Sequence, residues 1–188
     1  MVKEGDNRHM KFCSNCSGPV RLSIPEGDDR LRHICDECGS VHYQNPKLIA
    51  GCVPVFGDSV LLCRRAIEPR LGFWTLPAGF MELGETVAEA AIREAREEAE
   101  VDVSLEKAYT LLSLPTLSQV YVFYLASMSS CRFAAGPESL EVRLFKEEEI
   151  PWDHLAFETV RVTLNHFFSD RKSGQYTFRE LVLPLTLG

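Results

Sequence analysis

Residues 79–100 read GFMELGETVAEAAIREAREEAE, and this stretch decides the fold. Its first part belongs to a loop expected at 72–85, where Gly79 and Gly84 permit sharp backbone turns. In its second part Thr86 and Glu89 have the spacing of a capping box, and six residues of 86–100 are Ala or Ile. The stretch therefore predicts a glycine-rich loop that leads into a helix at 86–100.

The predicted helix carries a cluster of carboxylates. Glu94, Glu97 and Glu98 are spaced i, i+3 and i+4, which places them on one helical face. Residues 82–100 hold seven glutamates and only two arginines, a local charge of −5. Like charges one turn apart destabilise a helix, and hard cations such as Mg²⁺ or Mn²⁺ would remove that cost. A neighbouring stripe of mostly small side chains is expected to pack on a sheet: Ala88, Ile92, Ala95 and Ala99.

The alternative interpretation of this cluster is a solvated acidic face, which is the usual meaning of a charge run. A glycine-rich turn stands directly before the carboxylates, and this context favours a catalytic metal site over the solvated face.

The rest of the chain indicates a layered α/β domain. Strands are expected at 47–56, 59–63, 103–113, 119–127 and 141–145, with a second helix at 155–170 and a last strand at 176–184. Residues 120–125 read VYVFYL, which is apolar on both alternation faces. Such a strand is typical of a sheet that is covered on both sides.

Four cysteines precede this domain in two Cys-x2-Cys pairs: Cys13, Cys16, Cys35 and Cys38. Two such pairs at the ends of a hairpin supply the tetrahedral thiolate shell of a zinc site. The alternative, four ordinary small hydrophobic residues, does not explain the repeated spacing. Four filled positions predict a structural Zn²⁺ rather than a catalytic one. Cys52, Cys63 and Cys131 lack paired spacing and are expected to be packing residues.

Composition limits the classes of function. The chain has 188 residues and a formal charge of −7, which argues against broad binding to the backbone of a nucleic acid. The longest apolar run, 120–126, is too short to cross a membrane, and residues 1–30 lack the apolar core of a signal peptide. These features predict a cytoplasmic protein without a membrane partner.

The stretch at 79–101 resembles the Nudix box, Gly-x5-Glu-x7-Arg-Glu-U-x-Glu-Glu-x-Gly-U, in which U is bulky and apolar. The matching residues are Gly79, Glu85, Arg93, Glu94, Glu97, Glu98 and Val101. Ala95 is small for the first U, and Glu100 stands where the pattern has glycine. That glycine would end the helix in a left-handed conformation, which costs another residue about 1 kcal/mol.

The resemblance implies a Nudix α/β/α sandwich with a mixed sheet, preceded by a zinc ribbon. The implied domains are a flexible tail at 1–11, the ribbon at 12–45, the Nudix domain at 46–175 and a C-terminal strand or tail at 176–188. Two or three Mg²⁺ or Mn²⁺ ions would be held by Glu94, Glu97 and Glu98, with the Ala78 carbonyl as a further ligand. Glu85 and Arg93 would pair to brace the loop against the helix.

The implied activity is hydrolysis of a nucleoside diphosphate linked to another moiety. Residues 43–46 (YQNP), 74–79 (WTLPAG) and 136–141 (GPESLE) resemble plant-type FAD pyrophosphatases, which implies cleavage of FAD to FMN and AMP. ADP-ribose is the close competitor, because Pro115 downstream of the box also occurs in that group. The ribbon is similar to that of NADH pyrophosphatases, but residues 113–119 (SLPTLSQ) lack their Ser-Gln-Pro-Trp-Pro-Phe-Pro motif.

Two further alternatives stay open at this point. One is a pyrophosphatase of nucleoside triphosphates, which shares the box. The other is a non-catalytic sensor module, although an intact carboxylate set favours an enzyme. The expected partner is a small nucleotide, and Nudix proteins of this size are often homodimers.

A substrate with a flat ring needs an aromatic platform, for which Phe80, Trp74 and Tyr121 are candidates. Sheet core is the simpler interpretation of Tyr121, whereas Phe80 lies inside the box loop. This family often uses a general base outside the helix, and Glu138 and Glu141 are the candidates, each of which could also be a plain surface residue.

Overall fold

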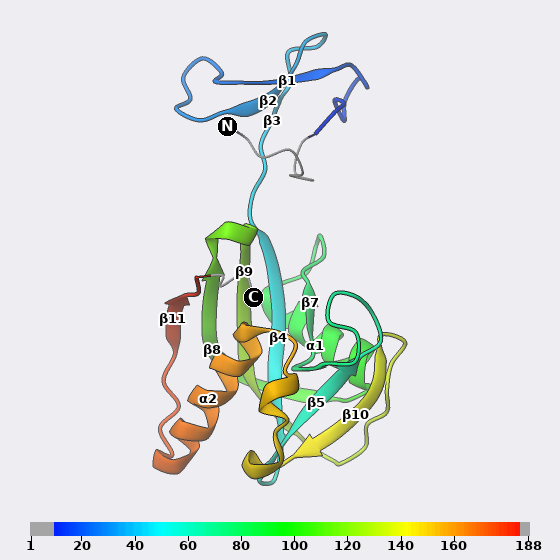
Figure 1. Cartoon of the computed structure of the whole chain (residues 1–188), viewed down its shortest axis with the longest axis vertical. Coiled ribbons are helices and arrows are strands. Elements are labelled where there is room, and N and C mark those ends of the chain that lie inside the picture. Colours follow the sequence, from blue (N-terminus) through cyan, green and yellow to red (C-terminus); the bar gives the residue numbers. More distant parts are fainter. Residues whose placement is uncertain (1–9, 185–188) are drawn as a thin grey trace. The chain divides into compact units, whose positions relative to one another are not determined.

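The structure, a computed structural model, describes residues 10–184. The chain divides into two compact units, residues 1–45 and 46–188, which are described separately (Figure 1). Most of the tail expected at 1–11 and the last residues of the segment 176–188 lie outside the described residues.

The first unit is a small antiparallel sheet of three strands in the order β1-β2-β3. These strands are Val20–Ser23, Arg32–Cys35 and Val41–His42. β1 and β2 form the hairpin that the alternating sequence predicts, with Val20 opposite Cys35 and Ser23 opposite Arg32. This register brings the second cysteine pair next to the start of β1.

The second unit is built on a mixed sheet with the strand order β10-β5-β4-β9-β8-β11. β4 is parallel to β9 and β8 is parallel to β11, whereas the other neighbours on this path are antiparallel. The expected strands are confirmed, and β4 has the predicted bounds. In chain order the strands of this path are Lys47–Phe56 (β4), Ser59–Arg65 (β5), Val103–Leu114 (β8), Gln119–Met128 (β9), Ser139–Phe145 (β10) and Arg179–Val182 (β11).

Two helices cover opposite faces of this sheet, and Figure 1 shows α2 in front of it and α1 behind it. Because successive side chains of a strand point to opposite faces, the core is divided into one cluster under α2 and another under α1. Val53 and Leu62 pack in the large cluster that includes Leu164 of α2, whereas Cys52 and Cys63 pack with Ala95 of α1. The α/β/α arrangement expected from the sequence is therefore confirmed, as are the packing roles of Cys52 and Cys63. The same expectation is wrong for Cys131, which is exposed.

Helix α1 spans Val87–Ala99 and has the predicted capping box between Thr86 and Glu89. Glu100 adopts the left-handed conformation that the box pattern reserves for glycine, with φ of 46°. The prediction of its packing stripe needs correction, because Ala88 and Ile92 are only partly buried. The buried face of α1 is shifted around the helix from the predicted stripe. It consists of Ala90, Ala91, Glu94, Ala95, Glu98 and Ala99.

Helix α2 spans Glu158–Ser173 and ends at Gly174, which has φ of 70°. The predicted start at residue 155 is wrong, because residues 152–154 form a separate 3₁₀ turn and Phe157 is an extended N-cap. The apolar residues of α2 are buried in the core: Val160, Leu164, Phe167 and Phe168. Neither α-helix within residues 10–184 is long and apolar enough to cross a membrane.

The predicted loop at 72–85 contains two short strands, β6 (Trp74–Thr75) and β7 (Ala78–Phe80). β6 pairs with β5 and β7 pairs with β4, so long-range pairing decides the conformation of a segment with weak local preference. The pairing is tight at Gly51, where a Cβ atom would lie 2.5 Å from the Pro77 carbonyl oxygen. β7 thereby fixes the start of the box against the centre of the sheet.

An ion pair between the buried Asp170 and the partly buried Arg179 ties the end of α2 to the edge of the sheet. Asp170 accepts hydrogen bonds from both terminal nitrogens of Arg179, at 2.6 and 2.7 Å, and from the hydroxyl of Tyr109 at 2.9 Å. The Arg179 guanidinium is the largest cause of the low pKa of Asp170, which is about 2. Because this pKa lies below the usual value of 3.8, the pair stabilises the fold above that pH and loses its effect as pH falls towards 2.

Replacement of Asp170 by Asn should lower the free energy of unfolding by about 2 kcal/mol, because the partly buried Arg179 would lose its charged partner. Urea unfolding at pH 7 measures this loss, and the difference from wild type should shrink between pH 4 and pH 2. The exposed Asp153 provides the control variant, Asp153→Asn. Equal stability of Asp170→Asn and Asp153→Asn would contradict the assigned role of the pair.

Candidate functional site

The loop before α1 is braced against the helix by one arginine. Arg93 donates two hydrogen bonds to Glu85, from Nη2 at 2.8 Å and from Nε at 3.1 Å, and a third to the Phe80 carbonyl at 3.1 Å. Glu85 also accepts from the backbone N–H of Glu82 at 2.6 Å. The structure therefore places the Glu85–Arg93 pair where the resemblance implies it, between loop and helix.

Two of the helix glutamates are buried. Glu94 is 8% exposed and Glu98 is 7% exposed. The contact with β7 is close, since a Cβ atom at Gly79 would lie 2.4 Å from the Glu94 carboxylate. Glu98 accepts a hydrogen bond from the Ala78 backbone N–H at 3.2 Å. A side chain at position 79 would therefore force the Glu94 carboxylate to move.

Burial perturbs the ionisation of both carboxyl groups. Loss of hydration is the main cause that raises the pKa of Glu98 to about 8, and the charge of nearby Glu94 adds to it. Burial also raises the pKa of Glu94, although Arg93 opposes this effect. Arg93 pairs with Glu94, whereas Glu98 has no ion-pair partner among the described residues. Two buried carboxylates with so little compensation are a costly arrangement that structural needs alone do not explain.

The carboxylates of Glu94, Glu97 and Glu98 do not form a closed ligand shell. Glu97 is largely exposed, and Nη1 of Arg93 lies between the carboxylates of Glu94, at 2.6 Å, and Glu97, at 3.0 Å. A hollow of about 550 Å³ lies along this outer side of α1, and Glu85, Arg93 and Glu97 are among its lining residues. The oxygen donors suit hard cations such as Mg²⁺ or Mn²⁺, with coordination positions left for a substrate.

The loop after β9 is held against the C-terminal end of α1. The backbone N–H groups of Ala134 and Gly136 donate to the carbonyls of Ala99 and Glu98, at 3.0 and 3.1 Å. A Cβ atom at Gly136 would lie 1.7 Å from the Glu97 carbonyl oxygen, so only glycine fits there. This positioning role was missed in the sequence, where the Gly-Pro dipeptide at 136–137 was its only local signal.

The structure separates the two candidates for a general base. Glu138 lies on this held loop, and its charge contributes to the raised pKa values of both Glu94 and Glu98. Glu141 is instead 3.6 Å from Arg64 in an exposed ion pair. The geometry therefore brings Glu138, and not Glu141, towards the helix carboxylates.

The three aromatic candidates lie in different environments. Phe80 is 48% exposed, and the Lys47 ammonium lies 5.1 Å from the centre of its ring. Trp74 packs edge-on against Phe145 with ring centres 4.8 Å apart, so its ring belongs to the core. Tyr121 is partly buried and stacks on Phe123 at 6.2 Å. Phe80 is thus the candidate with the most accessible ring.

The four cysteines of the first unit come together as predicted. Their sulfur atoms all lie within 4.8 Å of one another, with Cys13 and Cys38 at 3.7 Å and Cys16 and Cys35 at 3.4 Å. A tetrahedral zinc site with bonds of about 2.3 Å requires sulfur atoms about 3.8 Å apart. The residues therefore fit a zinc ion. Within residues 10–184, this quartet is the one group of His, Cys, Asp or Glu residues that meets so closely.

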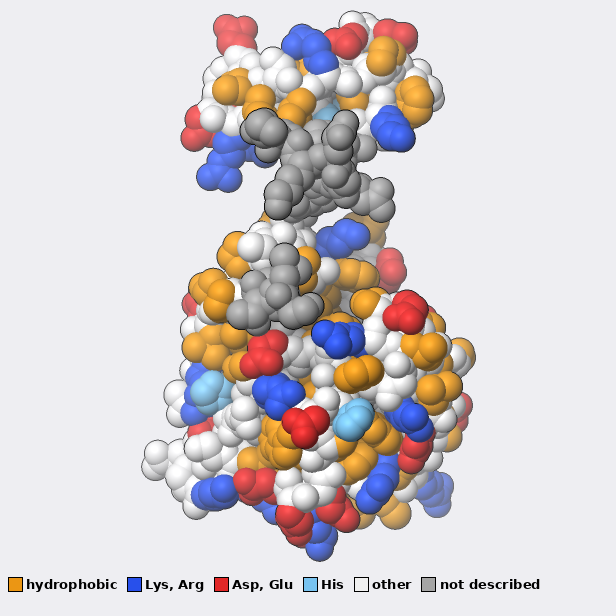
Figure 2. Space-filling model, in the orientation of Figure 1, with side chains coloured by type: hydrophobic (Ala, Val, Ile, Leu, Met, Phe, Trp, Pro, Cys, Tyr) orange, Lys and Arg blue, Asp and Glu red, His pale blue; other side chains and the backbone are white. Residues whose placement is uncertain are grey.

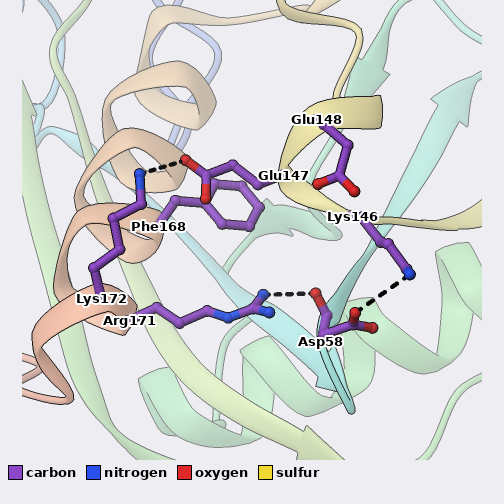
Figure 3. Close-up of a pocket in the computed structure, with 7 residues that line it drawn as sticks. All are labelled: Asp58, Lys146, Glu147, Glu148, Phe168, Arg171 and Lys172. Atoms are coloured by element: carbon purple, nitrogen blue, oxygen red, sulfur yellow. Dashed lines mark hydrogen bonds and ion pairs between the residues drawn. The ribbon is translucent and has the colours of Figure 1, made fainter.

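A second hollow, of about 320 Å³, lies apart from the box residues (Figure 3). Its charged side chains neutralise one another, as in the pairs of Lys146 with Asp58 and of Lys172 with Glu147. Figure 2 shows the same mixture of charges over the α2 face of this unit. The hollow therefore offers neither the buried glutamates nor the excess negative charge of the α1 side.

Comparison with protein families identifies both parts of the chain. A model described as a Nudix N-terminal zinc ribbon matches residues 11–44, and one described as the NUDIX domain matches residues 45–167. The crystal structure of a NUDIX hydrolase from Nitrosomonas europaea is 49% identical, with a TM-score of 0.91 over 94% of this chain and all of that chain.

More distant relatives carry more specific names. The chain is 30% identical over 148 residues to a protein from Salmonella heidelberg named NAD-capped RNA hydrolase NudC. The matched region covers 77% of this chain and 54% of that protein. The chain thus spans about half the length of the curated relatives it matches. An ADP-ribose pyrophosphatase from Streptococcus suis has a TM-score of 0.58 over 74% of this chain and 100% of that chain, and its 20% identity supports the shared fold alone.

The cysteine geometry predicts about one bound zinc per chain. Cys35→Ser should lose that zinc and unfold the first unit, because so small a unit depends on its metal. Metal analysis by mass spectrometry measures the zinc content, and circular dichroism follows unfolding. Cys131→Ser is the matched control, since this cysteine is exposed and outside the quartet. Equal zinc content in the two variants would contradict the site.

Proposed function

The chain belongs to the Nudix family, and from this premise we propose that it is a Mg²⁺- or Mn²⁺-dependent pyrophosphohydrolase of nucleoside diphosphate derivatives. The observation that carries the proposal is the burial of Glu94 and Glu98 against β7, where Arg93 pairs with Glu94 and, among the described residues, no basic side chain forms an ion pair with Glu98. A solvated acidic face would leave these side chains in water. Their burial supports a site designed to bind cationic charge.

Bound divalent cations would screen the pyrophosphate and activate a water molecule. In the proposed roles, Glu94, Glu97 and Glu98 hold these ions, and the Ala78 carbonyl is a further ligand. Arg93 and Glu85 keep the loop in place, so that the carboxylates do not move when substrate binds. Glu138 takes a proton from the attacking water, whose oxygen forms the new bond to phosphorus while the bridging oxygen leaves with the other phosphate.

For the substrate, we propose FAD or ADP-ribose. The segments at 43–46, 74–79 and 136–141 support FAD, and the half-exposed Phe80 offers a ring on which a flat group can stack. The absent Ser-Gln-Pro-Trp-Pro-Phe-Pro motif argues against NADH. The homodimer implied by the family remains a prediction, which the mass in solution tests.

A capped RNA, as named for the Salmonella relative, is the second candidate substrate. The ribbon gives it little support, because its arginines are paired with aspartates. Arg21 lies 2.7 Å from Asp36, and Arg32 lies 2.9 Å from Asp28. Few positive charges therefore remain to contact an RNA backbone, which favours a small nucleotide.

Glu98→Gln should reduce hydrolysis about 1,000-fold or more, because it removes a metal-holding charge while the side chain keeps its size. Turnover of FAD, ADP-ribose, NADH, nucleoside triphosphates and an NAD-capped oligonucleotide, each with Mg²⁺ and Mn²⁺, gives kcat/KM for both proteins. Glu100→Gln is the control, since Glu100 is an exposed helix end. Undiminished turnover by Glu98→Gln would refute the metal site, and a wild type inactive on every compound would favour a sensor module.

The two base candidates give a second test. Glu138→Gln should lower kcat about 100-fold or more, the usual contribution of a general base, with little change in KM. Glu141→Gln should retain activity close to wild type, because Glu141 is paired with Arg64. Stopped assays of kcat across pH 6–9 would distinguish the variants. The reverse order of losses would move the role to Glu141.

A further inference from the structure

Arg65, the last residue of β5, holds its guanidinium in one fixed plane. Its Nε donates a hydrogen bond to the Pro69 carbonyl at 2.8 Å. The guanidinium carbon lies 5.1 Å from the centre of the Phe157 ring, which supports one face of the group. A hydrogen bond on one edge and a ring on one face leave the two terminal nitrogens directed away from these supports.

These terminal nitrogens have no partner within residues 10–184. In the part of the chain that the structure describes, no carboxylate lies at ion-pair distance from Arg65, and no acceptor is bonded to either Nη atom. The neighbouring Arg64 differs, since it lies 3.6 Å from Glu141 and donates to the Gly72 carbonyl. Of two consecutive arginines, one is therefore engaged with the protein and the other presents a free fork.

The free fork lies at the metal-site end of the sheet. Arg65 is opposite Ser139 in the pairing of β5 with β10, and the next residue, Ala66, donates its N–H to the Glu138 carbonyl at 2.8 Å. Burial raises the pKa of Glu98 and of Tyr121, and the positive charge of Arg65 opposes that rise at both groups. Among the described residues, Arg65 forms neither an ion pair with Glu98 nor a hydrogen bond with Tyr121.

We propose that Arg65 binds a phosphate group of the substrate through its two terminal nitrogens, and so positions the pyrophosphate beside Glu98 and Glu138. A planar fork matches two phosphate oxygens, and a guanidinium already fixed in place loses little freedom on binding. The ligand class is a nucleoside diphosphate or its ester. This inference rests on the proposed function and adds a positioning residue to it.

A purely structural role is the competing explanation, because Arg65 also holds the 66–73 segment through Pro69. The test therefore measures binding separately from folding. Arg65→Ala, Arg65→Lys and the matched control Arg64→Ala are compared by melting temperature, by KM and kcat on the best substrate, and by calorimetric titration with α,β-methylene-ADP and Mg²⁺.

Arg65→Ala should raise both KM and the Kd of the ADP analogue about 10- to 100-fold, with a smaller change in kcat. Arg65→Lys should fall between this variant and wild type, because a lysine keeps the charge but not the fork. Arg64→Ala should stay within about twofold of wild type, as expected for an exposed pair. If Arg65→Ala does not fold, the KM and the Kd of the ADP analogue for Arg65→Lys alone test the proposal.

A Kd for Arg65→Ala or Arg65→Lys within twofold of wild type would overturn the proposal, whatever the melting temperature, and so would an equal loss in Arg64→Ala. A wild type that binds the analogue but hydrolyses nothing would refute the proposed function and leave the Arg65 comparison intact. A wild type that does not bind the analogue would overturn the assignment of Arg65.

Discussion

The structure depends on the burial of two like charges, those of Glu94 and Glu98, between α1 and the sheet. A carboxylate taken out of water loses several kcal/mol of hydration. Arg93 compensates for part of this loss at Glu94, and the Ala78 N–H and the charge of Arg65 do so at Glu98. The raised pKa of Glu98, about 8, expresses that imbalance. An arrangement that lowers stability in this way is explained by a functional role. Binding of divalent cations is the role that these oxygen donors can provide.

Three close backbone contacts make this burial geometrically possible. Gly51 lets β7 pair with the central strand β4, Gly79 lets β7 touch the Glu94 carboxylate, and Gly136 lets the following loop lie on the end of α1. Each would clash with backbone or with the carboxylate itself if it carried a side chain. The helix, the strand and the loop that bears Glu138 are thus assembled around the same carboxylates.

Local signals in the sequence were sufficient for the framework but not for contacts made across the fold. The strand-like stretch at 47–56 predicted β4, the Thr86–Glu89 spacing predicted the start of α1, and the paired cysteines predicted the sulfur cluster. β6 and β7 are too short to leave a periodic pattern, so their pairing was not foreseen. The free fork of Arg65 depends on its contacts with Pro69 and Phe157, and no local spacing encodes the second of them.

Thermal unfolding with and without Mn²⁺ at pH 8 tests most directly whether α1 carries a cation site. Without metal, Glu98→Gln should be at least as stable as wild type, because it removes a buried charge. Mn²⁺ should raise the melting temperature of wild type by several degrees and leave that of Glu98→Gln almost unchanged. Equal stabilisation of both proteins by Mn²⁺, or a wild type that does not respond, would contradict the account.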